Sequence, residues 1–286
     1  MTFLDDLAIG LISSVLEART GQTITEERRW RVPTVLMPLL REHGIESSSQ
    51  LVAAMTTAGS DGFVGEMVDA LLNNETYFFR DIGVFTALRQ AILPELARKI
   101  GARRKLTIWS AGCSTGQEAL SLAILIAEQP LAWAGWRIEI VATDVSARAI
   151  RAAQAGVYSQ FEVQRGLGVA QMLRHFDETP AGWKVRPEIA RMVRFAEENF
   201  LDGAPRPGAF DLILCRNVLL YFDQARRVAA FERLASALNP HGLLLLGGGE
   251  TAAGQCGYLA PHDDTFGIYS LRQRPADCAP SARRQY

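Results

Sequence analysis

Long apolar runs, paired cysteines and clustered histidines are all absent from this chain of 286 residues. No uninterrupted apolar stretch approaches the ~18 residues that a transmembrane helix needs. The first eighteen residues contain no lysine or arginine, so the basic start of a secretory signal peptide is missing. We therefore expect a cytoplasmic protein without direct membrane insertion.

The four cysteines lie far apart and include no C-x-x-C pair, a spacing that fits neither a disulfide framework nor a zinc site. The four histidines are scattered too, with no H-x-x-H or H-E-x-x-H pattern, so no metal site is expected. A formal net charge of −1 provides no positive field for nucleic acid. The composition therefore argues against metal-dependent and nucleic-acid-binding classes.

Residues 1–72 are expected to form a small all-helical N-terminal domain. Apolar side chains recur there at a helical spacing of 3.6 residues over 3–19. Thr25 is well suited to cap a second helix, which we predict over 25–40. Pro33 and Pro38 within it indicate a break or a kink. Two further helices are predicted at 47–57 and 63–72.

From residue 105 onwards strands alternate with helices, which indicates an α/β fold, a parallel sheet covered by helices on both faces. Residues 156–190 interrupt the alternation and are expected to form an insertion with its own small element. The tail, 273–286, is expected to be disordered. The predicted strands are 105–111, 137–143, 192–196, 210–215, 243–247 and 265–271, and the predicted helices are 117–128, 146–155 and 224–238.

A strand, a turn of small residues and a helix follow one another in IWSAGCSTGQE, residues 108–118. Such a turn lets a ligand approach the backbone N–H groups at the start of the helix. The next strand ends at Asp144, which places a carboxylate where the ribose of a bound nucleoside meets the sheet edge. The same carboxylate is also suited to cap the helix that follows.

Two residues in this turn distinguish between cofactors. Enzymes that bind dinucleotides usually carry G-x-G-x-x-G, but Ser114 takes the place of the middle glycine here. Glu118 lies in the first turn of the helix, where its negative charge would repel a pyrophosphate and attract a cationic amine. The electrostatics favour S-adenosylmethionine (SAM), which carries an ammonium group and a positive sulfur, over NAD.

Five short motifs are spread over most of the chain. They are NETYFFRD at 74–81, AGCSTGQE at 111–118, ATD at 142–144, RGL at 165–167 and FDLILCRNVLLYF at 210–222. Together they resemble the CheR-type chemoreceptor methyltransferases, a family that transfers methyl groups to receptor glutamates.

The resemblance implies a Rossmann-like SAM-dependent methyltransferase sheet over 105–272, preceded by the helical domain and carrying a small β insertion at 156–190. Residues 73–104 are implied to link the two domains and to cap the cofactor. SAM is the implied methyl donor and S-adenosylhomocysteine (SAH) the product. The implied partner is the cytoplasmic domain of methyl-accepting chemoreceptors, and we expect a monomer.

The resemblance also implies individual roles. Glu118 is implied to hold the methionine amino group, and Asp144 the ribose hydroxyls. Arg80 and Tyr221 are the implied catalytic residues, nearest the transferred methyl group. Cofactor contacts are further implied for Asn74, Thr76, Arg80, Gly112, Asn199, Phe200, Arg216 and Asn217.

The implied chemistry needs no general base, because a glutamate side chain is already ionised at neutral pH. The enzyme has to align this carboxylate with the S–CH₃ bond, and such orientation contributes roughly 7–11 kcal/mol. The guanidinium of Arg80 is suited to hold the carboxylate, and the hydroxyl of Tyr221 to steer it.

Two stretches depart from the family's pattern. The family's second helix is rich in arginine, whereas only Arg28, Arg29 and Arg31 cluster here. Residues 1–72 contain 5 Arg and no Lys against 10 Asp and Glu, a net charge of −5. Residues 247–250 are GGGE, where the family commonly has G-H-S-E.

Two other functions compete with receptor methylation. The first is a SAM-dependent methyltransferase that acts on another protein, a small molecule or a nucleic acid. The D/N/S-P-P-Y/F tetrad of enzymes that methylate nucleic-acid amino groups is absent after residue 215. The second is a non-catalytic SAM-binding scaffold, which the retention of Arg80, Tyr221, Glu118 and Asp144 disfavours.

Overall fold

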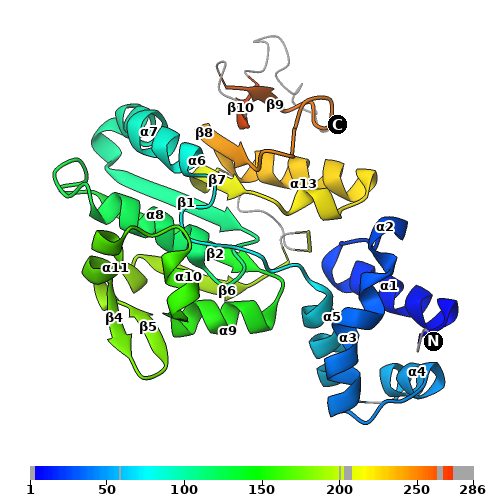
Figure 1. Cartoon of the computed structure of the whole chain (residues 1–286). Coiled ribbons are helices and arrows are strands. Elements are labelled where there is room, and N and C mark those ends of the chain that lie inside the picture. The colour runs from blue at the N-terminus through cyan, green and yellow to red at the C-terminus, as the bar shows by residue number, and fades with distance from the viewer. Residues whose placement is uncertain (1–3, 58, 200, 203–207, 263–266, 273–286) are drawn as a thin grey trace, which may run out of the picture.

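The computed structural model describes residues 4–57, 59–199, 201–202, 208–262 and 267–272 (Figure 1). Phe200, implied to be a cofactor contact, and the tail 273–286 lie outside the described residues. No helix in the described part of the chain is long and apolar enough to cross a membrane.

Five helices form the predicted N-terminal helical region: α1 (Asp6–Thr20), α2 (Glu26–Arg29), α3 (Arg31–Glu42), α4 (Ser48–Thr56) and α5 (Asp61–Leu71). Helix α1 begins where Asp5 accepts a hydrogen bond from the amide of Ala8 and ends at Gly21, whose φ is 76°. The expected break in the predicted helix over 25–40 lies at Trp30, between α2 and α3, and not at the prolines, since Pro33 and Pro38 both lie within α3.

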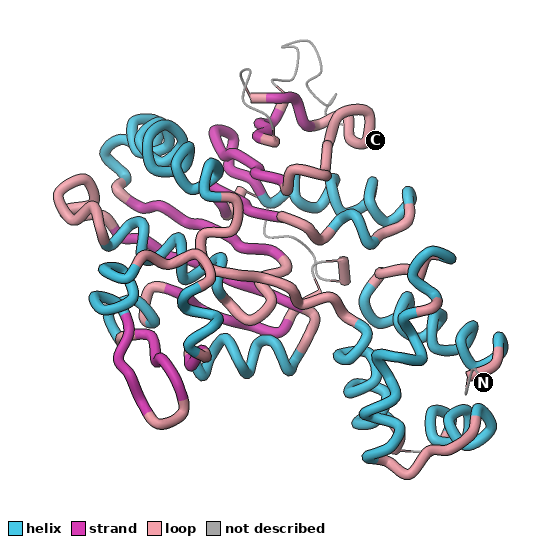
Figure 2. Tube along the Cα trace, in the orientation of Figure 1, coloured by secondary structure: helices cyan, strands magenta, loops and turns pink. Residues whose placement is uncertain are grey.

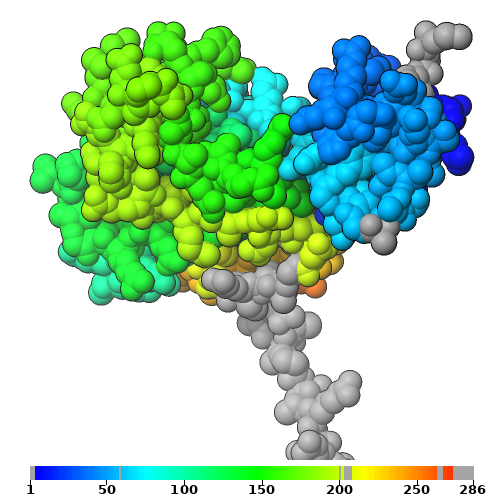
Figure 3. Space-filling view, turned by 90° about the horizontal axis from the view of Figure 1, so that it is seen from below, coloured from blue at the N-terminus to red at the C-terminus, as the bar shows by residue number. Residues whose placement is uncertain are grey.

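The helices of this region share an apolar core of their own. Leu36, Leu51 and Met67 are fully buried there, on α3, α4 and α5 respectively. The space-filling view shows the region, in blue, at one end of the molecule beside the remainder (Figure 3).

Seven strands form one sheet in the order β6-β2-β1-β7-β8-β10-β9. The five strands from β6 to β8 are parallel, as predicted, while β10 and β9 each run antiparallel to the preceding strand in this order. The strands are β1 (Lys105–Ala111), β2 (Arg137–Asp144), β6 (Val193–Glu197), β7 (Phe210–Cys215), β8 (Leu238–Leu246), β9 (Leu259–Pro261) and β10 (Ile268–Leu271).

Helices cover both faces of the sheet, as the tube view shows (Figure 2), which confirms the Rossmann-like class. Along β1, Leu106 and Ile108 pack against one layer of helices and Trp109 against the other. The first layer holds α7 (Leu93–Ile100), α8 (Gln117–Ala127) and α9 (Ala147–Ala155), and the second holds α13 (Gln224–Ala237).

The insertion carries the expected small β element, a three-stranded antiparallel sheet in the order β3-β5-β4. Helix α10 starts in a capping box between Ser159 and Glu162. The elements of the insertion are β3 (Val157–Tyr158), α10 (Gln160–Gln164), α11 (Val169–His175), β4 (Phe176–Thr179), β5 (Gly182–Val185) and α12 (Pro187–Ala190).

The stretch before β1 contains a helical segment that the sequence did not predict. Helix α6 (Ile82–Ala87) passes through a π-helical turn (Leu88–Ile92) into α7. Before it, Phe78 is fully buried and meets the rings of Tyr158 and Phe176 edge-on. The stretch therefore anchors the insertion to the rest of the fold.

Gly166, in the RGL motif, provides a test of this anchor. Its φ is +107°, and a Cβ atom there would collide with the carbonyl oxygen of Phe78. We expect Gly166→Ala to lower the free energy of unfolding by about 2–3 kcal/mol, because both the backbone and the contact must shift. Gly168→Ala, where a Cβ meets ordinary contact distances, is the matched control. Equal melting temperatures of the two variants would contradict the expectation.

Candidate functional site

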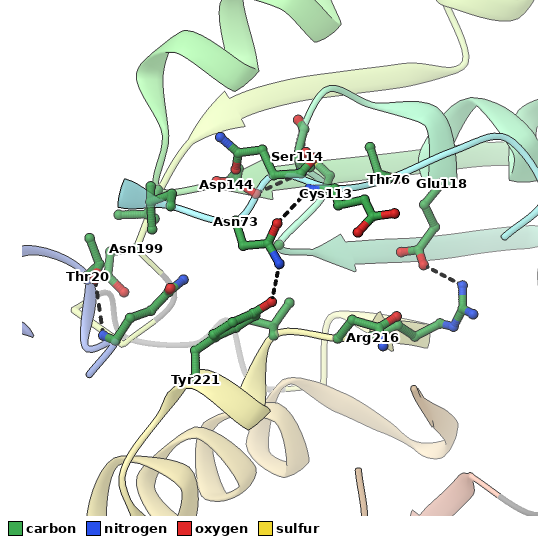
Figure 4. Close-up of a pocket in the computed structure, with 18 of the residues that line it drawn as sticks. Thr20, Asn73, Thr76, Cys113, Ser114, Glu118, Asp144, Asn199, Arg216 and Tyr221 are labelled. Atoms are coloured by element: carbon green, nitrogen blue, oxygen red, sulfur yellow. Dashed lines mark hydrogen bonds and ion pairs between the residues drawn. The ribbon is translucent and has the colours of Figure 1, made fainter. Parts of the chain in front are cut away.

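A pocket of about 830 Å³, its open mouth included, lies where the carboxyl ends of β1, β2 and β7 face the N-terminal helices. Such edges are where open α/β sheets bind ligands. The sequence-predicted residues that line it are Asn74, Thr76, Arg80, Gly112, Glu118, Asp144, Asn199, Arg216, Asn217 and Tyr221 (Figure 4).

The turn after β1 is shaped by backbone conformations that bring it close to its neighbours. Gly112 has a φ of 78°, and a Cβ atom there would collide with the side chain of Val218. The amides of Gly112 and Cys113 donate to the carbonyl of Thr143 at 2.8 and 2.9 Å. The hydroxyl of Ser114 donates to the carbonyl of Asn74 at 2.8 Å, which ties the turn to the capping stretch.

Asp144 is buried at the end of β2 and accepts two backbone hydrogen bonds. The amides of Ser114 and Ser146 donate to its two carboxylate oxygens at 2.7 and 2.9 Å. Burial raises the pKa of the Asp144 carboxyl, and the nearby Asp69 acts in the same direction. Asp69 lies on α5 and accepts a 2.5 Å hydrogen bond from Ser146, the N-cap of α9, so it connects this corner to the helical region.

Glu118 is held from two sides in the first turn of α8. Its Oε1 accepts a hydrogen bond from the hydroxyl of Ser110 at 2.8 Å, and its Oε2 pairs with Nη1 of Arg216 at 2.9 Å. The carboxylate is thereby fixed in orientation while both oxygens keep acceptor capacity for a ligand.

Arg216 makes contacts that its motif did not reveal. Its side chain is 1% exposed, and Nη2 donates to the carboxylate of Asp81 at 2.6 Å and to the carbonyl of Arg80 at 3.1 Å. Arg216 therefore connects Glu118 to the segment that carries Arg80. These three ionised side chains, Glu118, Asp81 and Arg216, sum to a charge of −1, so the cluster still favours a cation.

Tyr221 is fixed by two residues that the sequence analysis did not assign to the site. Nδ2 of Asn73 donates to the Tyr221 hydroxyl oxygen at 2.6 Å (Figure 4). The guanidinium of Arg28 lies 4.6 Å from the ring centroid, a cation–π contact from the helical region. Asn73 precedes the 74–81 motif directly, which is the one signal in the sequence that could have identified it.

Arg80 is half-buried at the pocket wall and makes no ion pair with any residue that the structure describes. Its Nη1 donates to the carbonyl of Glu75 at 2.8 Å. The Glu75 carboxylate pairs instead with Arg165 at 2.8 Å, and this hydrogen bond and charge lower its pKa. The charge of Arg80 also contributes to the lowered pKa of Glu75, and its guanidinium lies 5.7 Å from the ring centroid of Tyr77. Arg80 therefore keeps free donors for a ligand although its charge is partly balanced by Glu75.

Asn199 reaches the pocket from the loop after β6, but its side chain also supports the loop itself. Its Nδ2 donates to the carbonyl of Arg19 at 3.2 Å, and its Oδ1 accepts from the amide of Leu201 at 3.0 Å. The site thus draws on segments from both parts of the fold.

Among the described residues, no group of three or more His, Cys, Asp and Glu is placed to hold a metal ion.

The sheet and the carboxylate-lined pocket are those of a SAM-dependent methyltransferase. The model of the CheR methyltransferase SAM-binding domain matches residues 74–264, and this chain belongs to that family. Chemotaxis protein methyltransferase 1 of Pseudomonas aeruginosa is 39% identical over 240 residues, 82% of this chain and 86% of that protein. The chemotaxis protein methyltransferase of Vibrio parahaemolyticus is 35% identical over 245 residues, 85% of this chain and 88% of that protein.

A relative with a different name matches over a shorter stretch. The probable biofilm formation methyltransferase WspC of Pseudomonas aeruginosa is 34% identical over 200 residues, 69% of this chain and 46% of that protein.

The residues of the pocket fit SAM, the methyl donor of the family. The net negative cluster at Glu118 suits an ammonium group, and Asp144 can accept hydrogen bonds from hydroxyls. The recognition from sequence and the SAM assignment are both confirmed.

The buried pairing of Arg216 predicts a stability difference. Arg216→Met leaves Glu118 buried without its cation, so we expect the free energy of unfolding to fall by about 3–5 kcal/mol. Adding Glu118→Gln to this variant removes the uncompensated charge and should restore part of the loss. Urea unfolding followed by circular dichroism measures both. A single variant that is as stable as the double variant would contradict the pairing.

Proposed function

We propose that this protein transfers the methyl group of SAM to glutamate side chains in the cytoplasmic domain of a methyl-accepting chemoreceptor. The products are a glutamate methyl ester and SAH. One observation supports the acceptor most directly: Arg80 lines the donor pocket and makes no direct ion pair with any described residue, since the nearby Glu75 carboxylate pairs with Arg165. The chemotaxis relatives agree with such an acceptor, and a cytoplasmic monomer is part of the same proposal.

The donor is assigned to the carboxylates of the pocket. Glu118 is proposed to accept hydrogen bonds from the methionine ammonium, and Asp144 from the ribose hydroxyls. Bound SAM supplies an electrophilic methyl group on a positively charged sulfur. Further contacts with SAM are proposed for Asn74, Thr76, Arg80, Gly112, Asn199, Phe200, Arg216 and Asn217.

The acceptor glutamate arrives as a carboxylate, so no residue has to remove a proton. Arg80 is proposed to pair with the acceptor carboxylate and so to replace the water molecules that hydrate this carboxylate in solution. The hydroxyl of Tyr221, turned by its hydrogen bond with Asn73, is proposed to orient the attacking oxygen. Alignment and desolvation, which are tasks of these residues, then account for the rate.

A second cavity of about 550 Å³, its mouth included, shares Gln22, Leu72, Asn73 and Tyr221 with the first. Arg28 and Arg31 line it. We propose that the segment around the acceptor glutamate lies there. Of the arginines clustered at 28–31, Arg29 is paired with Asp6 and Glu26. Arg28, which stacks on Tyr221, and Arg31 make no ion pair with a described residue, so we propose that they contact this segment.

The proposal is tested with tritiated SAM, a receptor cytoplasmic fragment and the pure protein. We expect base-labile methyl esters on glutamates and a roughly 100-fold or greater loss of kcat/KM in Arg80→Ala, since misplaced reactants cost about that much. Arg98→Ala, an exposed arginine on α7, is the control. Full turnover in Arg80→Ala would remove the acceptor role, and base-stable product would refute an ester.

The raised pKa of Asp144 predicts how SAH binding depends on pH. Ribose hydroxyls donate best to the ionised carboxylate, so binding weakens as the pH falls towards this pKa, and it does so at a higher pH than for an ordinary aspartate. Calorimetry from about pH 8 down to about pH 5 measures this dependence. Asp144→Asn should bind more weakly with a flatter profile, and parallel profiles would exclude the ribose role.

A further inference from the structure

Glu250, the last residue of GGGE, is a buried carboxylate after β8 that the family-derived roles did not include. It is 6% exposed and accepts four backbone hydrogen bonds. Oε2 accepts from the amides of Asn217 and Gly247 at 2.7 and 2.9 Å. Oε1 accepts from the amides of Val218 and Leu219 at 2.9 and 2.7 Å.

Three of these four donors belong to the turn that follows β7. Asn217 has a φ of 60°, a conformation that residues other than glycine rarely adopt. Consecutive amides that converge on one carboxylate hold the turn in this shape, because these partly or fully buried donors would otherwise lack a partner. A carboxylate is required for this arrangement, since it alone offers acceptors on both oxygens and no donor.

The turn carries much of one wall of the pocket. Arg216, Asn217, Val218 and Tyr221 all line it, and Val218 lies against Gly112, which follows the neighbouring strand β1. Glu250 itself is not among the lining residues. We infer that Glu250 is a positioning residue for methyl transfer, which fixes the turn that presents Asn217 to the donor and Tyr221 to the acceptor.

The glycines before Glu250 differ in a way that this inference explains. A Cβ atom on Gly247 would lie 2.8 Å from Oε2 of Glu250 and 2.9 Å from the amide nitrogen of Asn217. It would therefore separate the carboxylate from the turn. Gly248 and Gly249 have nothing within 4 Å of a Cβ atom. Only the first glycine is thus required by the arrangement.

The test compares two variants that disturb the arrangement with two that do not. Glu250→Gln keeps the shape but turns an NH₂ group towards two of the four donors, and Gly247→Ala inserts a methyl group. Gly248→Ala is the neighbouring control. Leu106→Ala, at the fully buried opposite end of β1, is a control for lost stability alone. SAH binding is measured by calorimetry at a temperature where all variants are folded.

We expect the dissociation constant for SAH to rise roughly tenfold or more in Glu250→Gln and Gly247→Ala, the scale of a lost charge-assisted hydrogen bond. The kcat for methyl transfer should fall in the same two variants. Gly248→Ala and Leu106→Ala should bind within about twofold of the unaltered protein, even where Leu106→Ala melts earlier.

Unchanged SAH binding in folded Glu250→Gln and Gly247→Ala would overturn the inference and leave Glu250 a residue of stability alone. The binding measurement needs no acceptor, so its outcome is independent of whether receptor glutamates are the substrate.

Discussion

The site depends on one buried cation. Arg216 is enclosed by the protein and pairs at the same time with Glu118 on α8 and Asp81 in the capping stretch. Breaking such a pair would leave a buried charge uncompensated and would be strongly destabilising, so these contacts join the three segments to one another. That arrangement places a carboxylate at the donor end of the pocket and Arg80 at its wall.

The distribution of charge then separates the two reactants. In the proposed arrangement, Glu118 and Asp144 form the donor side and suit the ammonium and hydroxyl groups of SAM, whereas Arg80 and Arg28 form the acceptor side and suit a carboxylate. This arrangement would draw the proposed anionic acceptor and the cationic donor to adjacent positions. Because the proposed acceptor is already ionised, its methylation would depend on alignment, to which the hydrogen bond between Asn73 and Tyr221 contributes.

Local sequence patterns predicted part of the fold and part of the site. The strands 105–111 and 210–215 agree with the structure to the residue, because short apolar runs between turns mark buried strands. The helical segment 82–100 was missed, since its π-helical turn shifts the apolar spacing that identifies a helix. The motifs likewise predicted residues that the pocket brings together. The contacts of Glu250 join positions more than thirty residues apart, and no local pattern reports them.

The most direct test of this account is the crystal structure of the protein with SAH bound. The account predicts the amino group of SAH within hydrogen-bond distance of Glu118, the ribose hydroxyls at Asp144, and the sulfur facing Arg80 and Tyr221. Ligand density in the reverse orientation, or a ligand bound outside the pocket, would contradict it.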